Sequence, residues 1–104
     1  MTIGKALTVA GSDTSGGAGI QADLKTFQEL GVYGMTALTV VVAQNPANGW
    51  SHDIYPLPLA ALEAQLETVL AGIGVDALKT GMLGTIDMIA LVARKIDQYK
   101  IAND

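Results

Sequence analysis

The 104-residue sequence contains no cysteine and few charged or aromatic residues. Without cysteine there is neither a disulfide framework nor a thiolate metal site, which suits a reducing compartment. The sequence has one histidine and no acidic cluster beside it, so we expect no metal site. Six Lys and Arg against ten Asp and Glu give a net charge of −4, which disfavours nucleic acid and anionic membranes as partners.

Long hydrophobic runs are also missing. The most apolar stretch, residues 37–43, falls far short of the roughly 18 residues that a membrane span needs. The run at residues 6–10 is too short for the core of a signal peptide. Half of the residues are nevertheless hydrophobic, which excludes disorder as the dominant state. We therefore expect one small, soluble, cytoplasmic domain.

Strand and helix patterns alternate along the chain. Apolar runs predict buried strands at residues 5–10 and 35–43, and residues 76–80 predict a short third strand. Apolar residues at helical spacing predict helices, at residues 18–30, at about 58–72 and from a Thr85 cap onward. This β-α-β-α-β-α order is typical of an α/β fold with a parallel sheet. A fourth strand is expected to begin near residues 101–104, so we interpret the chain as the front part of a larger domain.

Three local features complete this prediction. Tyr33 and Gly34 indicate a turn before the second strand. Residues 44–58 indicate mostly loop, with a short edge strand at residues 51–55 as an option. The buried stripe of the last helix is expected to consist of Ile86, Ile89, Val92, Ala93 and Ile96.

The glycine-rich segment 11–19 is the strongest candidate site. It lies between a strand end and a helix start, the edge where open α/β sheets bind ligands. Its glycines permit close backbone approach, and the helix start offers N–H groups. The Asp13 carboxylate suits a hydroxyl or ring-nitrogen donor. The alternative is a tight turn in which Asp13 or Ser15 caps the helix. The spacing matches neither a Walker A motif nor GxGxxG.

Polar residues also end the other two strands. The carboxamide of Gln44, followed by Asn45, matches the edge of an aminopyrimidine or hydroxypyridine ring, or simply opens a loop. Met82 either covers an aromatic ring with its thioether or belongs to the core. Lys79 is either a cation near a ligand or a solvent-facing edge residue. Three side chains of segment 44–58 are candidates for a lid over a flat ligand or for ordinary surface and interface residues: Trp50, His52 and Tyr55.

The string GSDTSGGAGIQADLKTF, followed by AQN and LKTGMLG, resembles a known family. It is similar to the N-terminal part of the hydroxymethylpyrimidine/phosphomethylpyrimidine kinases and the related pyridoxine/pyridoxal kinases of Gram-positive bacteria. The resemblance covers essentially the whole chain. It implies a three-layer α/β/α, ribokinase-like (Rossmann-like) fold with a parallel sheet. Residues 1–104 would then be the N-terminal, substrate-binding part of a single kinase domain.

The resemblance implies ATP- and Mg²⁺-dependent phosphorylation of the hydroxymethyl group of a vitamin-precursor ring. That ring would be pyridoxine or pyridoxal in vitamin B6 salvage, or 4-amino-5-hydroxymethyl-2-methylpyrimidine and its phosphate in thiamine biosynthesis. Gln44 resembles the pyrimidine branch, whereas WSHDIYPLP resembles the pyridoxal branch. Segment 44–58 resembles the family's substrate-covering flap, near the contact of an expected homodimer. The implied substrate-binding residues are Gly11, Asp13, Gly19, Val42, Gln44 and Met82.

One part of the family pattern is not matched in this sequence. The family's Gly-x-Gly-Cys/Asp loop, with its catalytic base, and most of the ATP contacts lie later in the family's chains. No residue here is therefore assigned as a catalytic base, and the residues that bind ATP stay unassigned. We expect the 104-residue chain alone to be inactive. Two other hypotheses are a non-catalytic module that binds a small heterocycle and one half of a split or oligomeric assembly.

Overall fold

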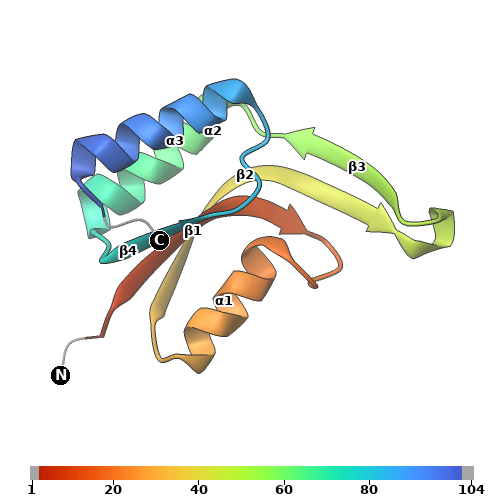
Figure 1. Ribbon diagram of the computed structural model, residues 1–104, viewed down its shortest axis with the longest axis horizontal. Helices are drawn as coiled ribbons and strands as arrows, with labels where there is room; N and C mark the ends of the chain where they lie inside the picture. Colours follow the sequence, from red (N-terminus) through yellow and green to blue (C-terminus); the bar gives the residue numbers. More distant parts are fainter. Residues whose placement is uncertain (1–2, 102–104) are drawn as a thin grey trace.

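A computed structural model describes residues 3–101 of the chain. Figure 1 shows a central sheet with helix α1 on one face and helices α2 and α3 on the other. This arrangement confirms the predicted three-layer order. The elements are β1 (Lys5–Asp13), α1 (Gly19–Glu29), β2 (Tyr33–Asn45), the 3₁₀ turn η1 (Pro46–Asn48), β3 (Ser51–Pro56), α2 (Leu59–Glu67), the π-helical segment η2 (Thr68–Ile73), β4 (Ala77–Thr80) and α3 (Ile86–Tyr99).

The sheet has the strand order β3-β2-β1-β4. Strand β1 pairs in parallel with β2 and with β4, as predicted for the three inner runs. Strand β3 instead pairs antiparallel with β2, so the sheet is mixed rather than purely parallel. The edge strand offered for residues 51–55 is confirmed as β3. The expectation that residues 44–58 are mostly loop was wrong, because β2, η1 and β3 form a continuous ribbon there.

Two further predictions at the strand ends were wrong. Tyr33 and Gly34 are not a turn, because they pair with Lys5 and Ala6 at the start of β2. Strand β1 also continues three residues beyond residue 10. A bulge between Ala10 and Ser12 shifts the register while the strand keeps pairing with β2.

The main core lies between the sheet and helices α2 and α3. Leu7 and Val9 on β1 and Leu62 and Leu66 on α2 are fully buried. From α3 the core receives Met88, Leu91 and Val92. The predicted buried stripe of α3 was therefore largely wrong, since Ile86 is 83% and Ile89 is 52% exposed. Both faces of this helix carry apolar residues at helical spacing, so the sequence period does not distinguish the buried face.

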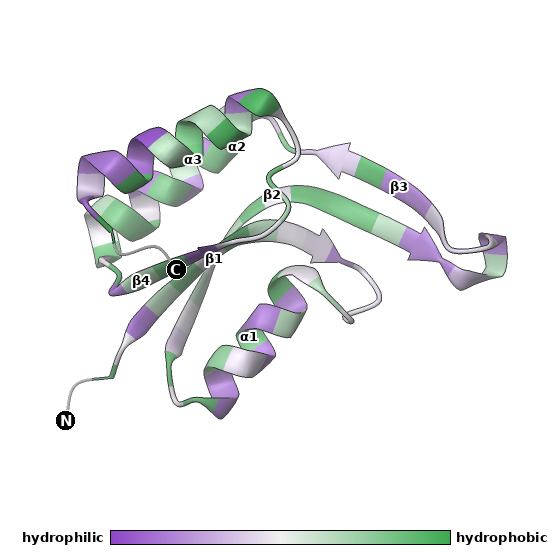
Figure 2. Ribbon diagram, viewed as in Figure 1, coloured by the Kyte–Doolittle hydropathy of each residue, from purple (hydrophilic) through white to green (hydrophobic). Residues whose placement is uncertain are grey.

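Helix ends follow the sequence more closely. Thr85 caps α3 as predicted, with its hydroxyl oxygen accepting a hydrogen bond from the Met88 N–H at 3.1 Å. No helix within residues 3–101 is long and apolar enough to cross a membrane. The expected start of a fourth strand at residues 101–104 lies almost wholly outside the described residues. In Figure 2 the middle of β2 is hydrophobic and its carboxyl end is hydrophilic. Gln44, near this carboxyl end, lines the candidate site.

Candidate functional site

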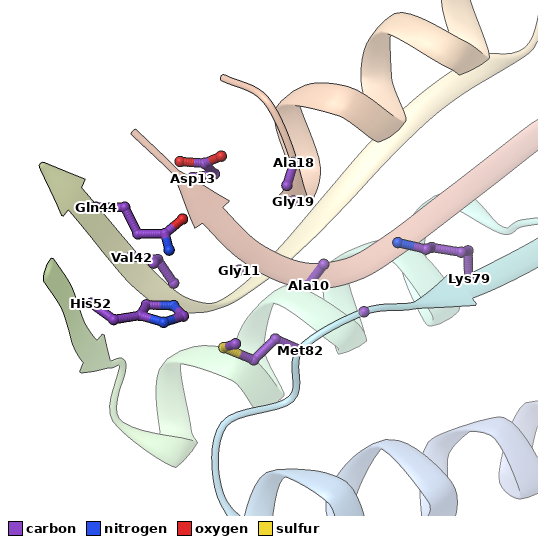
Figure 3. Close-up of a pocket in the computed structure, with 11 residues that line it drawn as sticks. Ala10, Gly11, Asp13, Ala18, Gly19, Val42, Gln44, His52, Lys79 and Met82 are labelled. Atoms are coloured by element: carbon purple, nitrogen blue, oxygen red, sulfur yellow. The ribbon is translucent and has the colours of Figure 1, made fainter. Parts of the chain in front are cut away.

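A cavity of about 320 Å³ opens where β1, β2 and β4 end. This is the carboxyl edge of the parallel strands, where α/β sheets bind ligands. Figure 3 shows Asp13, Gln44 and His52 toward one end of this cavity and Lys79 toward the other. The lining residues are Ala10, Gly11, Asp13, Ala18, Gly19, Val42, Gln44, His52, Lys79, Gly81 and Met82. All six proposed substrate-binding residues are therefore gathered around one cavity.

Gly19 allows the glycine-rich segment to close over β1. Its φ is +63°, a conformation that side-chain-bearing residues rarely adopt. A Cβ atom at this position would lie only 2.3 Å from the Gly11 carbonyl oxygen. Ser12 and Gly19 also form an isolated antiparallel bridge. The start of α1 is therefore held directly against the end of β1, at the wall of the cavity.

Asp13 is the buried acid of the cavity, with 8% of its surface exposed. Its Oδ1 accepts hydrogen bonds from the Ser15 hydroxyl at 2.8 Å and from the Ser15 N–H at 3.0 Å. These bonds, the hydroxyl first, hold the pKa of Asp13 below its ordinary value, although burial of the carboxyl opposes them. Asp13 is thus a carboxylate at neutral pH, and a ligand hydroxyl or protonated ring nitrogen can donate to it.

The alternative role of Asp13 or Ser15 as a helix cap was wrong. Ala18 occupies the N-cap of α1, and its methyl group cannot accept a hydrogen bond. Gln21 supports the segment instead. Its Oε1 accepts from the Asp13 N–H at 3.0 Å, and its Nε2 donates to the Ser12 hydroxyl at 2.7 Å. One side chain from the first turn of α1 therefore fixes the backbone beneath the Asp13 carboxylate.

The β2–β3 ribbon supplies the second wall. Gln44 on β2 lies opposite His52 on β3 in the antiparallel register, and both line the cavity. Val42 lies two residues earlier on β2, on the same face, and is buried. Trp50 and Tyr55 are 61% and 63% exposed and are not among the described residues that line the cavity. A lid role for these two aromatic residues stays a prediction.

The loop after β4 supplies the third wall. The Met82 carbonyl oxygen accepts a hydrogen bond from the buried Thr39 hydroxyl at 2.7 Å, which ties the loop to β2. The Met82 side chain is 44% exposed and faces the cavity, so the core alternative for this residue was wrong. The Lys79 ammonium lies 2.9 Å from Asp23 Oδ2 on α1 and also lines the cavity.

Sequence reasoning did not name two of the lining residues, Ala10 and Gly81. It left Lys79 open between a cation near a ligand and a solvent-facing edge residue, and the structure places Lys79 at the cavity. Gly81 was predictable in part, because it follows a parallel strand at the same edge. Gln21 was missed because its role depends on the bulge in β1, which brings the Ser12 hydroxyl toward α1. Within residues 3–101, no three His, Asp or Glu side chains lie close enough together to hold a metal ion.

A mixed α/β sheet with helices on both faces and a ring-sized cavity at its carboxyl edge defines a class, the α/β proteins that bind small molecules. Comparison with known proteins narrows this class. Residues 13–103 match the family described as phosphomethylpyrimidine kinase. The chain belongs to this family, and its fold is the N-terminal part of the ribokinase-like fold.

Individual relatives come from both branches that the sequence resembles, the pyridoxine kinases and the hydroxymethylpyrimidine/phosphomethylpyrimidine kinases. The chain is 60% identical to the pyridoxine kinase of Bacillus subtilis (strain 168) over 103 residues, which are 99% of this chain and 38% of the relative. It is 57% identical to the hydroxymethylpyrimidine/phosphomethylpyrimidine kinase of the same strain over 99 residues, or 95% of this chain and 36% of the relative.

Solved structures agree with this assignment. The pyridoxal kinase from Staphylococcus aureus, in complex with AMP-PCP and pyridoxal, matches with a TM-score of 0.90 and 52% identity. The match covers 97% of this chain and 37% of that one. The chain therefore spans less than two-fifths of the length of these relatives.

Proposed function

We propose that this chain is the substrate-binding part of an ATP-dependent kinase that phosphorylates the hydroxymethyl group of a vitamin-precursor ring. The candidate rings are pyridoxine or pyridoxal, and 4-amino-5-hydroxymethyl-2-methylpyrimidine with its phosphate. The carrying observation is the cavity at the strand ends. It combines a buried carboxylate, Asp13, with a carboxamide, Gln44, and a thioether, Met82. This is the donor and acceptor set that orients a flat heterocycle.

Each lining residue has a role in this proposal. Asp13 accepts from a ring nitrogen or hydroxyl, and Gln44 pairs with an exocyclic amine or hydroxyl. Val42 and Met82 pack on the two sides of the ring, and Gly11 and Gly19 let the backbone approach it. His52 on β3 closes the open side, with Trp50 and Tyr55 as further lid residues.

ATP and Mg²⁺ are part of the proposed reaction but not of this chain's own site. Phosphoryl transfer needs groups that surround the transferred phosphate. The family's Gly-x-Gly-Cys/Asp loop lies later in the family's chains, so we assign the metal, the nucleotide and the catalytic base to the remaining length of the family's domain. We further propose a cytoplasmic location and a homodimer for the whole enzyme. The alternatives are a binding module without chemistry and half of a split assembly.

The test separates binding from turnover. The 104-residue chain is incubated with each ring, first alone for binding and then with Mg²⁺-ATP for product formation. We expect binding of at least one ring and no phosphorylated product. Product formed by the pure chain would overturn the assignment of catalysis to the rest of the domain. Absence of binding for every ring would overturn the substrate-binding role itself.

Gln44 provides the test of ring preference. In the full enzyme, Gln44→Met removes the carboxamide but keeps the length of the side chain. We predict that it weakens the binding of the aminopyrimidine by about tenfold and that of pyridoxal by less, because an exocyclic amine would lose its paired acceptor. Dissociation constants for both rings check this difference. Equal losses for the two rings would refute the role of Gln44 in discrimination.

A further inference from the structure

Lys79 is a charged residue of the cavity that the proposed function does not use. Among the described lining residues it is the one lysine or arginine. Its stem starts on β4, opposite Thr8 of β1, and its ammonium reaches toward the cavity (Figure 3). A Cβ atom at Gly81, which also lines the cavity, would lie 3.3 Å from Lys79 Nζ. The ammonium is therefore part of the cavity wall.

One residue of another element binds this ammonium, and a second residue fixes the first. Asp23 Oδ2 on α1 accepts a hydrogen bond from Lys79 Nζ at 2.9 Å. The same oxygen accepts from the hydroxyl of Thr8 at 2.6 Å. Thr8 is fully buried, and the side chain of Asp23 is 19% exposed. The lysine is therefore anchored to a carboxylate that is itself fixed from inside the sheet.

The cavity consequently has two charged ends. Asp13 lies five residues beyond Thr8 along β1, and a strand advances about 3.3 Å per residue. The backbone positions that carry the carboxylate and the ammonium are thus several residues apart along neighbouring strands, which leaves room between them for a substituted six-membered ring. An ammonium has three N–H donors, and the described residues supply one acceptor, Asp23. Its other donors are available to a ligand in the cavity.

We propose that Lys79 is a specificity-determining residue that selects ligands with an anionic oxygen on the side of the ring opposite Asp13. This inference rests on the proposed function and names a property of the same site. Two sources of that oxygen exist among the candidate ligands. One is the phosphate ester of the phosphorylated pyrimidine, and the other is the ionised phenolic hydroxyl of pyridoxal. The unphosphorylated hydroxymethylpyrimidine has neither group and serves as the neutral reference.

The experiment measures dissociation constants by equilibrium dialysis with the full 104-residue chain. The three ligands are the phosphorylated pyrimidine, pyridoxal and the neutral pyrimidine. The variant Lys79→Met removes the ammonium, and Lys79→Arg keeps a positive charge. Lys25→Met is the matched control, since it removes a lysine of α1 that is bonded to the Gly16 carbonyl oxygen and does not line the cavity. Each result is expressed relative to the neutral pyrimidine.

We expect Lys79→Met to weaken the binding of the anionic ligands about tenfold or more, relative to the binding of the neutral pyrimidine. Lys79→Arg retains most of the preference, and Lys25→Met leaves the ratio unchanged. A loss confined to the phosphate ester or to pyridoxal identifies which oxygen Lys79 meets. An equal loss for all three ligands, or no loss, overturns the proposal.

One further variant keeps the test decisive. Lys79→Met leaves Asp23 without its partner, so the double variant Asp23→Asn/Lys79→Met is measured as well. It removes both charges and is expected to show the same loss of preference. If the wild-type chain binds none of the three ligands, the proposed function fails. If it binds them and the ratios do not respond to Lys79, only the inference about Lys79 fails.

Discussion

The two faces of the sheet differ in how they use their side chains. On the face covered by α2 and α3, the strands and helices contribute fully buried leucines, such as Leu7, Leu62 and Leu66. On the face covered by α1, none of the eleven described residues of that helix is buried. Its contacts with the sheet include the polar pair of Thr8 with Asp23. Stability thus resides mainly on the first face, whereas α1 on the second face supplies the polar partners of two charged cavity residues, Asp13 and Lys79.

Core substitutions should show the largest contrast between the two faces. We predict that Leu66→Ala lowers the free energy of unfolding by about 2–5 kcal/mol, because it leaves a cavity among fully buried side chains. The matched change on α1, Leu24→Ala, should cost about 1 kcal/mol or less, since Leu24 is 36% exposed. Urea unfolding followed by circular dichroism measures both. Equal losses of unfolding free energy in the two variants would show that the two faces contribute alike to stability.

The backbone of the α1 face should respond to a smaller change. Gly19→Ala places a methyl group against the Gly11 carbonyl oxygen in addition to the strain of a positive φ. We predict a loss of ring binding and a decrease in stability of about 1–3 kcal/mol. Gly31→Ala is the control, because Gly31 has a φ of +70° and no atom within 4 Å of its added Cβ. It should cost about 1 kcal/mol without affecting binding. Unchanged binding in Gly19→Ala would contradict the closure seen at this position.

The α2/α3 face also contains a polar contact, whose effect should be the smallest. Glu67 on α2 is hydrogen-bonded to Lys95 and Tyr99 on α3. The Lys95 bond, followed by that of Tyr99, holds the pKa of Glu67 below its ordinary value of 4.5. The pKa of Lys95 is raised above 10.5, chiefly by its bond to Glu67.

The pH dependence follows from the direction of these shifts. The contribution of Glu67 is present above pH 4.5 and is lost as the pH falls through its lowered pKa. The contribution of Lys95 is present below pH 10.5 and is lost as the pH rises through its raised pKa. Glu67→Gln should therefore lower stability at neutral pH by less than Leu66→Ala, and the difference from wild type should shrink in acid. A difference that stays constant from pH 7 to pH 3 would refute this coupling.

The sequence predicted the residues of the cavity better than the packing of α3 on the sheet. Residue types at strand ends located Asp13, Gln44 and Met82 at one edge, because parallel strands bring their carboxyl ends together. The sequence did not identify the buried face of α3, because Ile86 and Ile89 repeat with the same helical period as Met88 and Leu91. Which of the two stripes packs on the sheet depends on tertiary contacts.

The polar side chains of α1 that hold β1 and Lys79 in place were the hardest to predict. Gln21 and Asp23 lie near the start of α1, just after the glycine-rich segment, and look like ordinary surface residues in the sequence. Their partners, Ser12 and Thr8, become visible only when the bulged strand is placed against the helix. The resemblance of the glycine-rich string to the kinase family identified the family correctly, but it assigned no role to these residues.

The binding of a ring to the Asp13 end of the cavity is the central claim, and direct titration tests it most simply. The wild-type chain and Asp13→Asn are each titrated calorimetrically with pyridoxal and with the hydroxymethylpyrimidine. Saturable one-to-one binding of at least one ring by the wild type, weakened about tenfold or more in Asp13→Asn, is the predicted result. The claim is contradicted if neither ring saturates the wild-type chain, or if Asp13→Asn binds as tightly as the wild type.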